Sequence, residues 1–255
     1  MTARGDPVLL LEPRPAEAAF AAARLAAGQD VLLTPRPWLS AAALDRLERA
    51  ARAGGARLAV VNPERARPSR RLLRQQIESG HLGRPGLVRL HRWLPVASPE
   101  APAGDGAGAA GALPLACAPD LDVALWLMGA LPDVVYAVER DGQTLLVHLG
   151  FPGGGMALLD YAAALPPGDG YEALSVIGAT GAAYADDHHN SQLLFRGGHP
   201  AALRVDERGW EAEVLAGDLA AAFDAGIAGW RGVLAVAGAV CASIASGRAC
   251  APEDV

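Results

Sequence analysis

Short apolar runs alternate with helix-like segments along the first 65 residues. The runs occupy residues 7–12, 31–34 and 57–62. Between them, residues 16–28 are rich in alanine and end in glycine. Residues 40–55 begin with a serine suited to cap a helix and carry apolar residues on one face. Strand, helix, strand, helix, strand in this order predicts a parallel sheet with right-handed crossovers.

After residue 65 the strands and helices no longer alternate at short, regular intervals. Residues 69–79 are predicted to form a helix, and residues 87–95 alternate between polar and apolar types as a strand does. Residues 96–114 are rich in glycine, alanine and proline, which favours a loop. Residues 120–132 predict an amphipathic helix that a proline ends.

From residue 134 to about residue 214 the chain consists of short apolar segments separated by turns. This pattern predicts an antiparallel or mixed sheet of about six strands. Two closing helices are expected at residues 218–228 and 232–247. We therefore predict an α/β domain over residues 1–65 and an α+β domain over residues 66–255, with the last helix packing back on the first domain.

Composition and charge narrow the class of protein. The chain has 255 residues, of which 51% are hydrophobic and 20% charged, so a globular protein of one or two domains is expected. The net charge of -6 argues against nucleic acid as a partner. The arginine-dense segment at residues 65–74 is interpreted as a solvated helix face. Residues 232–247 are too short and too rich in small residues to span a bilayer, so no membrane partner is expected.

The basic and sulfur-containing residues also exclude some chemistry. All 22 basic residues are arginine, so a mechanism that needs a lysine amine is excluded for this sequence. Cys117, Cys241 and Cys250 form no CxxC pair, and we interpret them as free thiols in a reducing compartment. The first residues lack the long apolar stretch of a signal peptide. Together these features predict a cytoplasmic protein.

Two local motifs resemble a metal site and a phosphate-binding loop, but both are better explained as turns. Residues 184–192, YADDHHNSQ, place two carboxylates beside two imidazoles, but neighbouring residues on a strand point to opposite faces. A polar hairpin is favoured over a metal site, and no metal is expected. The glycines of FPGGGMALLD, residues 151–160, lack a following helix, lysine or hydroxyl, so a hairpin turn is predicted rather than a phosphate loop.

Five segments resemble one known family in the right order. They are AAARLAAGQDVLLTPRP, ERARPSRRLLRQQIESGHLGRPGLVRL, DLDVALWLMGALP, EALSVIGATGAAYADD and GVLAVAGAVCASIASGRAC. Read together, from about Asp6 to about Ala251, the chain resembles the Gfo/Idh/MocA family of NAD(P)-dependent oxidoreductases. The resemblance implies a Rossmann-like domain followed by a domain with a large open-faced, mostly antiparallel sheet.

The sequence departs from that family at its beginning. The family starts with a strand and a GxGxxG turn that place a pyrophosphate at a helix N-terminus. No such segment occurs in this sequence, and residues 7–12 correspond to the fourth strand of the nucleotide sheet. We therefore expect a partial, half Rossmann-like sheet, truncated at the N-terminus, and no cofactor. NAD or NADP remains the alternative.

The family's catalytic positions also carry other residue types. Its lysine position falls on Pro35, or on Arg36 after a shift of one residue, and its Asp-x-x-x-His falls on Leu115 and Pro119. A further family histidine falls on Glu17. Arginine does not readily release a proton, so no catalytic residue is expected. The resemblance leaves a residual ligand pocket as a hypothesis, made of Arg36, Asn62, Arg65, Arg92, Trp93 and Asp122.

Three functions remain open from the sequence. The first is a non-catalytic relative of sugar and cyclitol dehydrogenases, acting as an interaction subunit beside a full-length paralogue or as a degenerate sugar or cyclitol binder. It would form a homo-oligomer, a dimer or higher, through the C-terminal sheet. The second is an NAD(P)-dependent oxidoreductase on a sugar-like alcohol, with the cofactor site completed by a partner chain. The third is a lyase that uses His91 or His188 as its base.

Overall fold

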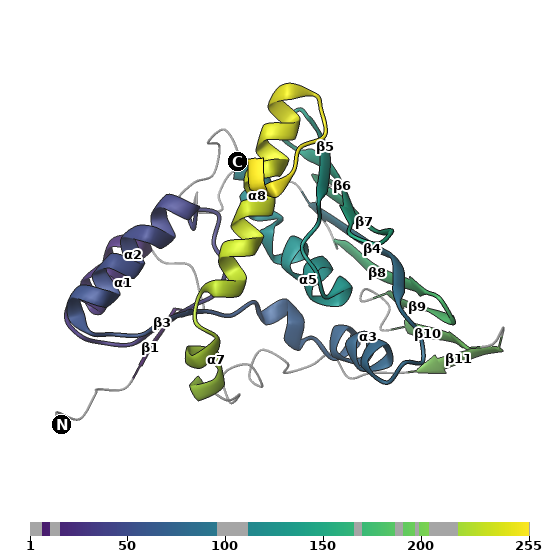
Figure 1. Cartoon of the computed structure of the whole chain (residues 1–255), viewed down its shortest axis with the longest axis horizontal. Helices are drawn as coiled ribbons and strands as arrows, with labels where there is room; N and C mark the ends of the chain where they lie inside the picture. The colour runs from purple at the N-terminus through teal and green to yellow at the C-terminus, as the bar shows by residue number, and fades with distance from the viewer. Residues whose placement is uncertain are drawn as a thin grey trace.

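A computed structural model describes residues 7–10, 16–95, 112–165, 170–186, 191–196, 199–203 and 219–254. A small α/β unit and a large sheet lie on opposite sides of a central helix, α8 (Figure 1). The helices are α1 (Glu17–Ala26), α2 (Ala41–Gly54), α3 (Pro68–Glu78), α4 (Ala112–Ala116), α5 (Ala118–Met128), α7 (Leu219–Ala225) and α8 (Ala228–Ser246), with two 3-10 turns, η1 (Pro63–Ala66) and η2 (Pro252–Asp254).

The small sheet is parallel, as the sequence predicts. Its strands are β1 (Val8–Leu10), β2 (Val31–Leu33) and β3 (Leu58–Val60), in the order β1-β2-β3. On one face, α1 and α2 bury their apolar sides against the strands. Ser40 caps α2, because its hydroxyl accepts a hydrogen bond from the Ala43 amide at 3.3 Å.

The helix α7 completes this unit on its other side. The amide of Val60 donates to the carbonyl of Gly226 at 3.3 Å, which engages the outer edge of β3. Phe223 packs with Leu32 and Ala59 on the face that α1 and α2 leave uncovered. The small sheet is thus sandwiched, with β1 as its other outer strand in the described chain.

Within the described residues the large sheet has eight strands. Seven of them lie from residue 134 onward, where about six were expected, and the eighth is the strand predicted at residues 87–95. The order of the sheet is β11-β10-β9-β8-β4-β7-β6-β5. Among the strand pairs of the described residues, only that of β4 with β7 is parallel, so the sheet is mixed and mostly antiparallel. The strands are β4 (Pro85–Pro95), β5 (Val134–Arg140), β6 (Thr144–Phe151), β7 (Gly155–Leu165), β8 (Tyr171–Gly178), β9 (Gly181–Asp186), β10 (Ser191–Arg196) and β11 (His199–Leu203).

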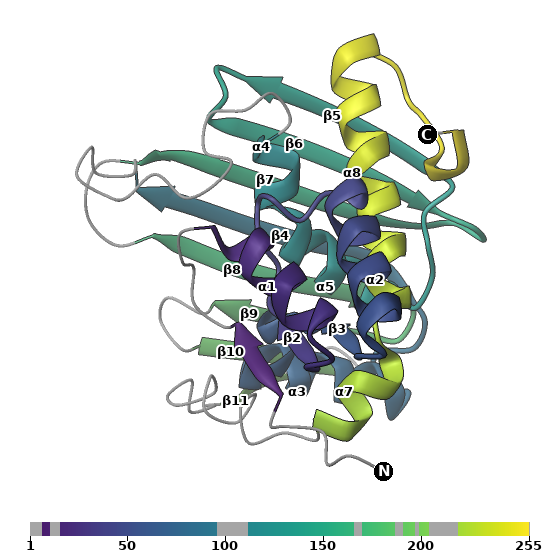
Figure 2. The same ribbon diagram turned by 90° about the vertical axis from the view of Figure 1, so that its left-hand side faces the viewer.

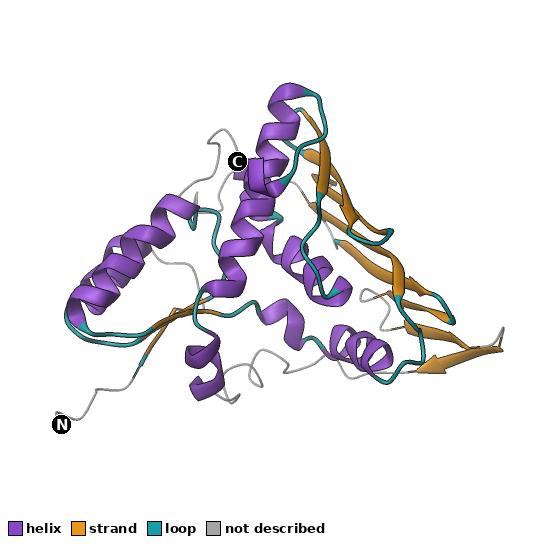
Figure 3. Ribbon diagram, viewed as in Figure 1, coloured by secondary structure: helices purple, strands orange, loops and turns teal. Residues whose placement is uncertain are grey.

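All described helices lie on one side of this sheet (Figures 1 and 3). Strand residues alternate, so Val88, Val147, Leu159 and Val176 are buried in the core on one face of the sheet. The prediction that α5 is amphipathic was wrong. Most of its residues are buried between the sheet and α8. It ends at Gly129, whose φ of 70° favours glycine, rather than at a proline.

The helix α8 begins at Ala228, four residues earlier than the sequence indicated. It packs on β5 and α5, and Arg231 at its start forms ion pairs with Asp45 and Glu48 of α2 at 2.9 and 2.6 Å. Length and composition alone would let α8 cross a membrane, with a hydropathy of 1.5 and 44% of the scored window buried. Its buried side is that of a core helix between the two units (Figure 2).

Several sequence hypotheses fall outside the described residues. Most of the predicted loop at 96–114, the segment at 211–217 and residues 187–190, which include His188, are among them. The hypotheses of a metal site or a lyase base there stay untested. Within the described ranges, no group of three or more His, Cys, Asp or Glu residues could hold a metal ion.

The close contact between α1 and α2 yields a stability prediction. A Cβ at Gly54 would lie 2.0 Å from the Leu25 carbonyl oxygen and 2.9 Å from the Gly28 amide nitrogen. We expect Gly54→Ala to lower the free energy of unfolding by about 1 to 3 kcal/mol, measured by urea denaturation followed by circular dichroism.

Gly229→Ala is the matched control, because a Cβ there meets nothing within 4 Å. It is expected to be neutral or to stabilise by up to about 1 kcal/mol, since alanine favours helix over glycine. Equal effects of the two substitutions would contradict the packing argument.

Candidate functional site

A cavity of about 250 Å³ lies where the two units meet. The carboxyl ends of β2 and β3 open on one side of it, and the inner face of β4 and β7 with the start of α5 forms the other. This volume is below the range of about 300 to 1,000 Å³ typical of drug-sized ligand pockets, so it suits a small molecule. The lining residues are Thr34, Pro35, Arg36, Asn62, Pro63, Glu64, Arg92, Leu94, Ala116, Pro119, Asp120 and Tyr161.

The strand end at Thr34–Ser40 is held in place by a buried carboxylate. Glu17, at the start of α1, is 1% exposed and accepts hydrogen bonds from Arg36 Nε at 3.2 Å and Trp38 Nε1 at 3.3 Å. The Arg36 guanidinium also donates to the carbonyl oxygens of Pro35 and Leu10. Arg36 is therefore committed to joining the ends of β1 and β2 to α1, although it borders the cavity.

Arg92 of β4 is the most connected charged group beside the cavity. It binds both carboxylate oxygens of Asp120, from Nε at 2.6 Å and from a terminal nitrogen at 2.8 Å. Its other terminal nitrogen donates to Glu172 of β8 at 2.7 Å, whereas the terminal nitrogen bound to Asp120 also lies 3.1 Å from a carboxylate oxygen of Glu64 in η1. One guanidinium thus ties together β4, α5, β8 and η1.

Two arginines of the predicted solvated face belong to the same network, so that interpretation was wrong. Arg70 is 3% exposed and lies in ion pairs with Glu64 and Glu172. Arg67 also pairs with both carboxylates. The helix α3 turns these side chains inward because its start packs against η1 and the large sheet. Three guanidinium groups and three carboxylates therefore face one another, and their charges cancel.

A second polar cluster supports the floor of the site. The Asn62 amide donates to Asp122 Oδ2 and to the Pro119 carbonyl, each at 2.8 Å. Arg65 forms a two-pronged pair with the same Asp122 carboxylate, which is 3% exposed. The side-chain oxygen of Asn62 accepts from the Glu64 amide at 3.1 Å and caps η1. This cluster fixes the end of β3 against α5.

Burial and neighbouring charges shift the pKa values of three groups that line the cavity, Asp120, Arg92 and Tyr161. Burial alone would raise the pKa of Asp120, but Arg92, Arg70 and Arg67 outweigh it and hold that pKa below its ordinary value. Burial likewise opposes Arg92 and is outweighed by Asp120 and Glu172, so its pKa is raised and it stays protonated. Burial raises the pKa of the Tyr161 hydroxyl, which stays neutral. A general base with a pKa near the working pH is not among these groups.

The structure brings most of the sequence-predicted site residues together. Arg36, Asn62 and Arg92 line the cavity, as do Pro35 and Pro119, to which the sequence resemblance assigns two of the family's catalytic positions. Behind them, Arg65 and Asp122 contact the Asn62 cluster, and Leu115 lies outside the lining.

Trp93 does not join the others. Because neighbouring strand residues point to opposite faces and Arg92 faces the cavity, Trp93 lies on the outer face of the sheet. There its ring lies 5.7 Å from that of Tyr171 and it is 37% exposed. The hypothesis that Trp93 stacks on a ligand inside this cavity is therefore wrong.

Sequence reasoning missed Glu64, Arg67, Arg70, Tyr161 and Glu172. Glu172 is 80 residues from Arg92, with which it pairs, so no local spacing relates the two. The only available signal was strand alternation: Leu174 and Val176 mark the buried face of β8, and Glu172 shares their phase.

The described strand ends do not fit a nicotinamide dinucleotide. Its pyrophosphate needs glycine backbone and a free helix N-terminus. No glycine occurs at residues 34–40 or 61–67. The start of α2 is already capped by Ser40, and the start of α1 carries the buried carboxylate of Glu17, which would repel a phosphate.

Comparison with known proteins establishes the fold. No family model and no curated protein matches the sequence. Among solved structures, a probable dehydrogenase from Thermotoga maritima has a TM-score of 0.75 at 20% identity, covering 98% of this chain and 82% of that one. The chain has the Gfo/Idh/MocA fold.

Two further solved structures have the same architecture. For an aldose-aldose oxidoreductase from Caulobacter crescentus, the TM-score is 0.71 at 18% identity, over 96% of this chain and 79% of that chain. For a UDP-N-acetylglucosamine 3-dehydrogenase from Acidithiobacillus ferrooxidans, the TM-score is 0.73 at 22% identity, over 94% and 79%. Identities this low support the shared fold and leave activity open.

The Arg92 network predicts a pH-dependent stability. The pKa of Asp120 is lower in the folded chain than its unfolded value of about 4, so its ionised form stabilises the fold above about pH 5. That contribution is lost as pH falls through the lowered folded pKa. Asp120→Asn should reduce the free energy of unfolding by about 3 kcal/mol at pH 7 and flatten its decline between pH 5 and 3, as measured in urea.

Glu48→Gln provides the control for the charge change. Glu48 pairs with Arg52 and Arg231 at the surface, and loss of such an exposed pair costs under about 1 kcal/mol. A result in which Asp120→Asn behaves like Glu48→Gln would contradict a central role for the buried network.

Proposed function

We propose that this protein is a non-catalytic binding protein with the Gfo/Idh/MocA fold. It holds a small, uncharged, sugar-like or cyclitol-like molecule in the cavity between its two units and carries out no hydride transfer. The observation that carries the proposal is the mutual neutralisation of Glu64, Asp120 and Glu172 by Arg67, Arg70 and Arg92. These groups are engaged with one another and not with a reacting atom.

The charge balance favours an uncharged ligand. A charged molecule would have to separate a buried ion pair, and breaking such a pair costs about 3 to 5 kcal/mol. The Tyr161 hydroxyl borders the cavity and makes no hydrogen bond within the described part of the chain. It can both donate and accept, which suits the hydroxyl groups of a polyol. Two of the solved structures with this fold are named for enzymes of aldoses and a nucleotide sugar, which agrees with that class.

Hydride transfer has little support among these residues. It needs a nicotinamide held beside the substrate carbon and a base for the hydroxyl proton. The described strand ends do not fit the dinucleotide, the Tyr161 pKa is raised, and the carboxylate of Asp120 is bound to Arg92. The cavity can bind and orient a polyol without reacting with it.

A binding assay on the full chain tests this function. We expect at least one of D-glucose, D-galactose and myo-inositol to raise the melting temperature saturably. A ligand present at about 100 times its Kd adds about 2.7 kcal/mol, equivalent to about 5 to 10 °C for a chain of this size. NADH and NADPH should change neither the melting temperature nor their own fluorescence. Saturable NADH binding with turnover of a sugar would instead support the oxidoreductase completed by a partner chain.

A pair of tyrosine variants locates the binding site. Tyr161→Phe removes the cavity hydroxyl and should weaken polyol binding up to about tenfold, the value of one hydrogen bond. Tyr136→Phe makes the same change on β5, where the side chain is 40% exposed on the outer face, and should leave the Kd unchanged. Equal affinities for both variants and the wild type would place the ligand elsewhere.

A further inference from the structure

The side chains that line the cavity offer few free hydrogen-bond donors. The Thr34 hydroxyl donates to a backbone carbonyl, and the Asn62 amide donates to a carbonyl and a carboxylate. All three guanidinium nitrogens of Arg92 bind carboxylates. Those of Arg36 bind one carboxylate and two backbone carbonyls. Each donor atom of these four side chains therefore already has a partner within the protein.

The backbone around the cavity is also poor in donors. Pro35, Pro63 and Pro119 line it, and proline has no amide hydrogen. The amides of Glu64 and Asp120 already donate to oxygen atoms of neighbouring residues, at 3.1 and 2.9 Å. A ligand oxygen that has to accept a hydrogen bond therefore finds few donors in the described part of the lining.

The polar end of the cavity lies at Arg92 and Tyr161. These residues are register partners on β4 and β7, and both line the cavity. Each oxygen of the Asp120 carboxylate accepts one hydrogen bond from Arg92 and can accept a second. The Tyr161 hydroxyl can both donate and accept. This end therefore offers partners for two hydroxyl groups of a sugar.

The lining becomes apolar further along β4. Leu94 lines the same cavity two residues beyond Arg92, which is about 7 Å along the strand. With Ala116 and the three prolines, five of the twelve described lining residues are apolar. A ligand hydroxyl placed against Leu94 would be buried without a partner, which weakens binding about 5- to 150-fold.

We propose that the cavity binds a 6-deoxyhexose in preference to the corresponding hexose, with ring hydroxyls at Asp120 and Tyr161 and the terminal methyl group at Leu94. This inference rests on the proposed function, because it names the sugar class for the same cavity. In a 6-deoxyhexose a methyl group replaces the hydroxymethyl group, so the hydroxyl that would meet Leu94 is absent. Leu94 is then the residue that determines specificity.

Titration calorimetry on the full chain with matched sugars tests the preference. D-fucose and D-galactose differ only in the hydroxyl at carbon 6, and so do 6-deoxy-D-glucose and D-glucose. We expect the Kd of the deoxy sugar to be at least about tenfold lower in one of the two pairs, because an unpaired hydroxyl is avoided and a methyl group is buried.

The outcomes separate this preference from the proposed function. A ratio below tenfold in both pairs would overturn the preference and leave the proposed function standing. Binding of myo-inositol with none of the four sugars would have the same consequence. No saturable binding of any of these five compounds would contradict the proposed function itself, and the preference with it.

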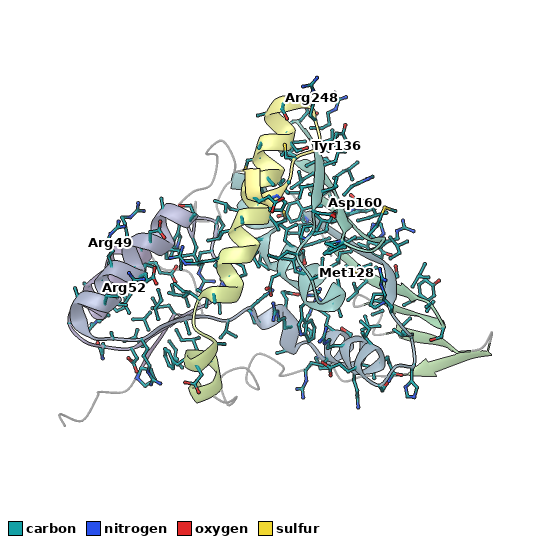
Figure 4. The ribbon with its side chains drawn as sticks, in the orientation of Figure 1. Arg49, Arg52, Met128, Tyr136, Asp160 and Arg248 are labelled. Carbon is teal, nitrogen blue, oxygen red and sulfur yellow. The ribbon has the colours of Figure 1, made fainter. Side chains whose placement is uncertain are left out.

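A pair of leucine variants tests the place of the methyl group. Leu94→Thr adds a hydroxyl at the apolar end, keeps a residue type that favours strands, and should bring the two Kd values of the discriminating pair within about twofold. Leu146→Thr makes the same change where the side chain is 42% exposed, and should leave the ratio unaltered. Leu146 is the register partner of Asp160, which Figure 4 shows on the side of the large sheet away from α8.

Far-ultraviolet circular dichroism first establishes that both variants are folded. An unaltered ratio in folded Leu94→Thr would overturn the assignment of Leu94. If Leu94→Thr does not fold, the matched sugars on the unaltered chain still decide the preference.

Discussion

The ion network around Arg92 joins the parts of this molecule that enclose the cavity. Arg92 lies in β4, and its carboxylate partners come from α5, β8 and η1. Arg67 and Arg70 add α3 to the same cluster. Pairing lets these charges be buried between the elements, because an unpaired buried charge costs several kcal/mol. The position of the cavity wall thus follows from charge pairing as much as from apolar packing.

The same pairing limits the chemistry of the site. A carboxylate held by a guanidinium has a lowered pKa and takes up a proton poorly, and arginine does not release one at ordinary pH. Arg36 is likewise tied to Glu17 and to backbone carbonyls. What stabilises the cavity therefore removes its acids and bases, and hydrogen bonding through neutral groups such as Tyr161 is what remains. The proposal that the cavity binds a ligand without reacting with it is based on this balance.

Local patterns were enough to predict the small parallel sheet, since each strand and helix of it is set by neighbouring residues and by the Ser40 cap. The short apolar segments after residue 134 predicted the strands of the large sheet, and the family resemblance implied that they form one open-faced sheet. The network escaped prediction because its partners are far apart, as Arg92 and Asp120 are by 28 residues. An arginine run such as that of α3 has the same sequence pattern whether it faces water or carboxylates. The error over α5 has a related cause, because burial on all sides depends on β4, β7 and α8.

The strand β4 contributes side chains both to the cavity and to the outer face of the large sheet. It pairs with β7 on one side and β8 on the other, so its backbone is fixed by hydrogen bonds along both edges. Alternation sends Arg92 to the cavity and sends Arg89, His91 and Trp93 to the outer face. Because the central strand is held on both edges, a change of side chain on one face does not have to move the other. The cavity and the outer face can therefore be altered separately, which is why variants of one serve as controls for the other.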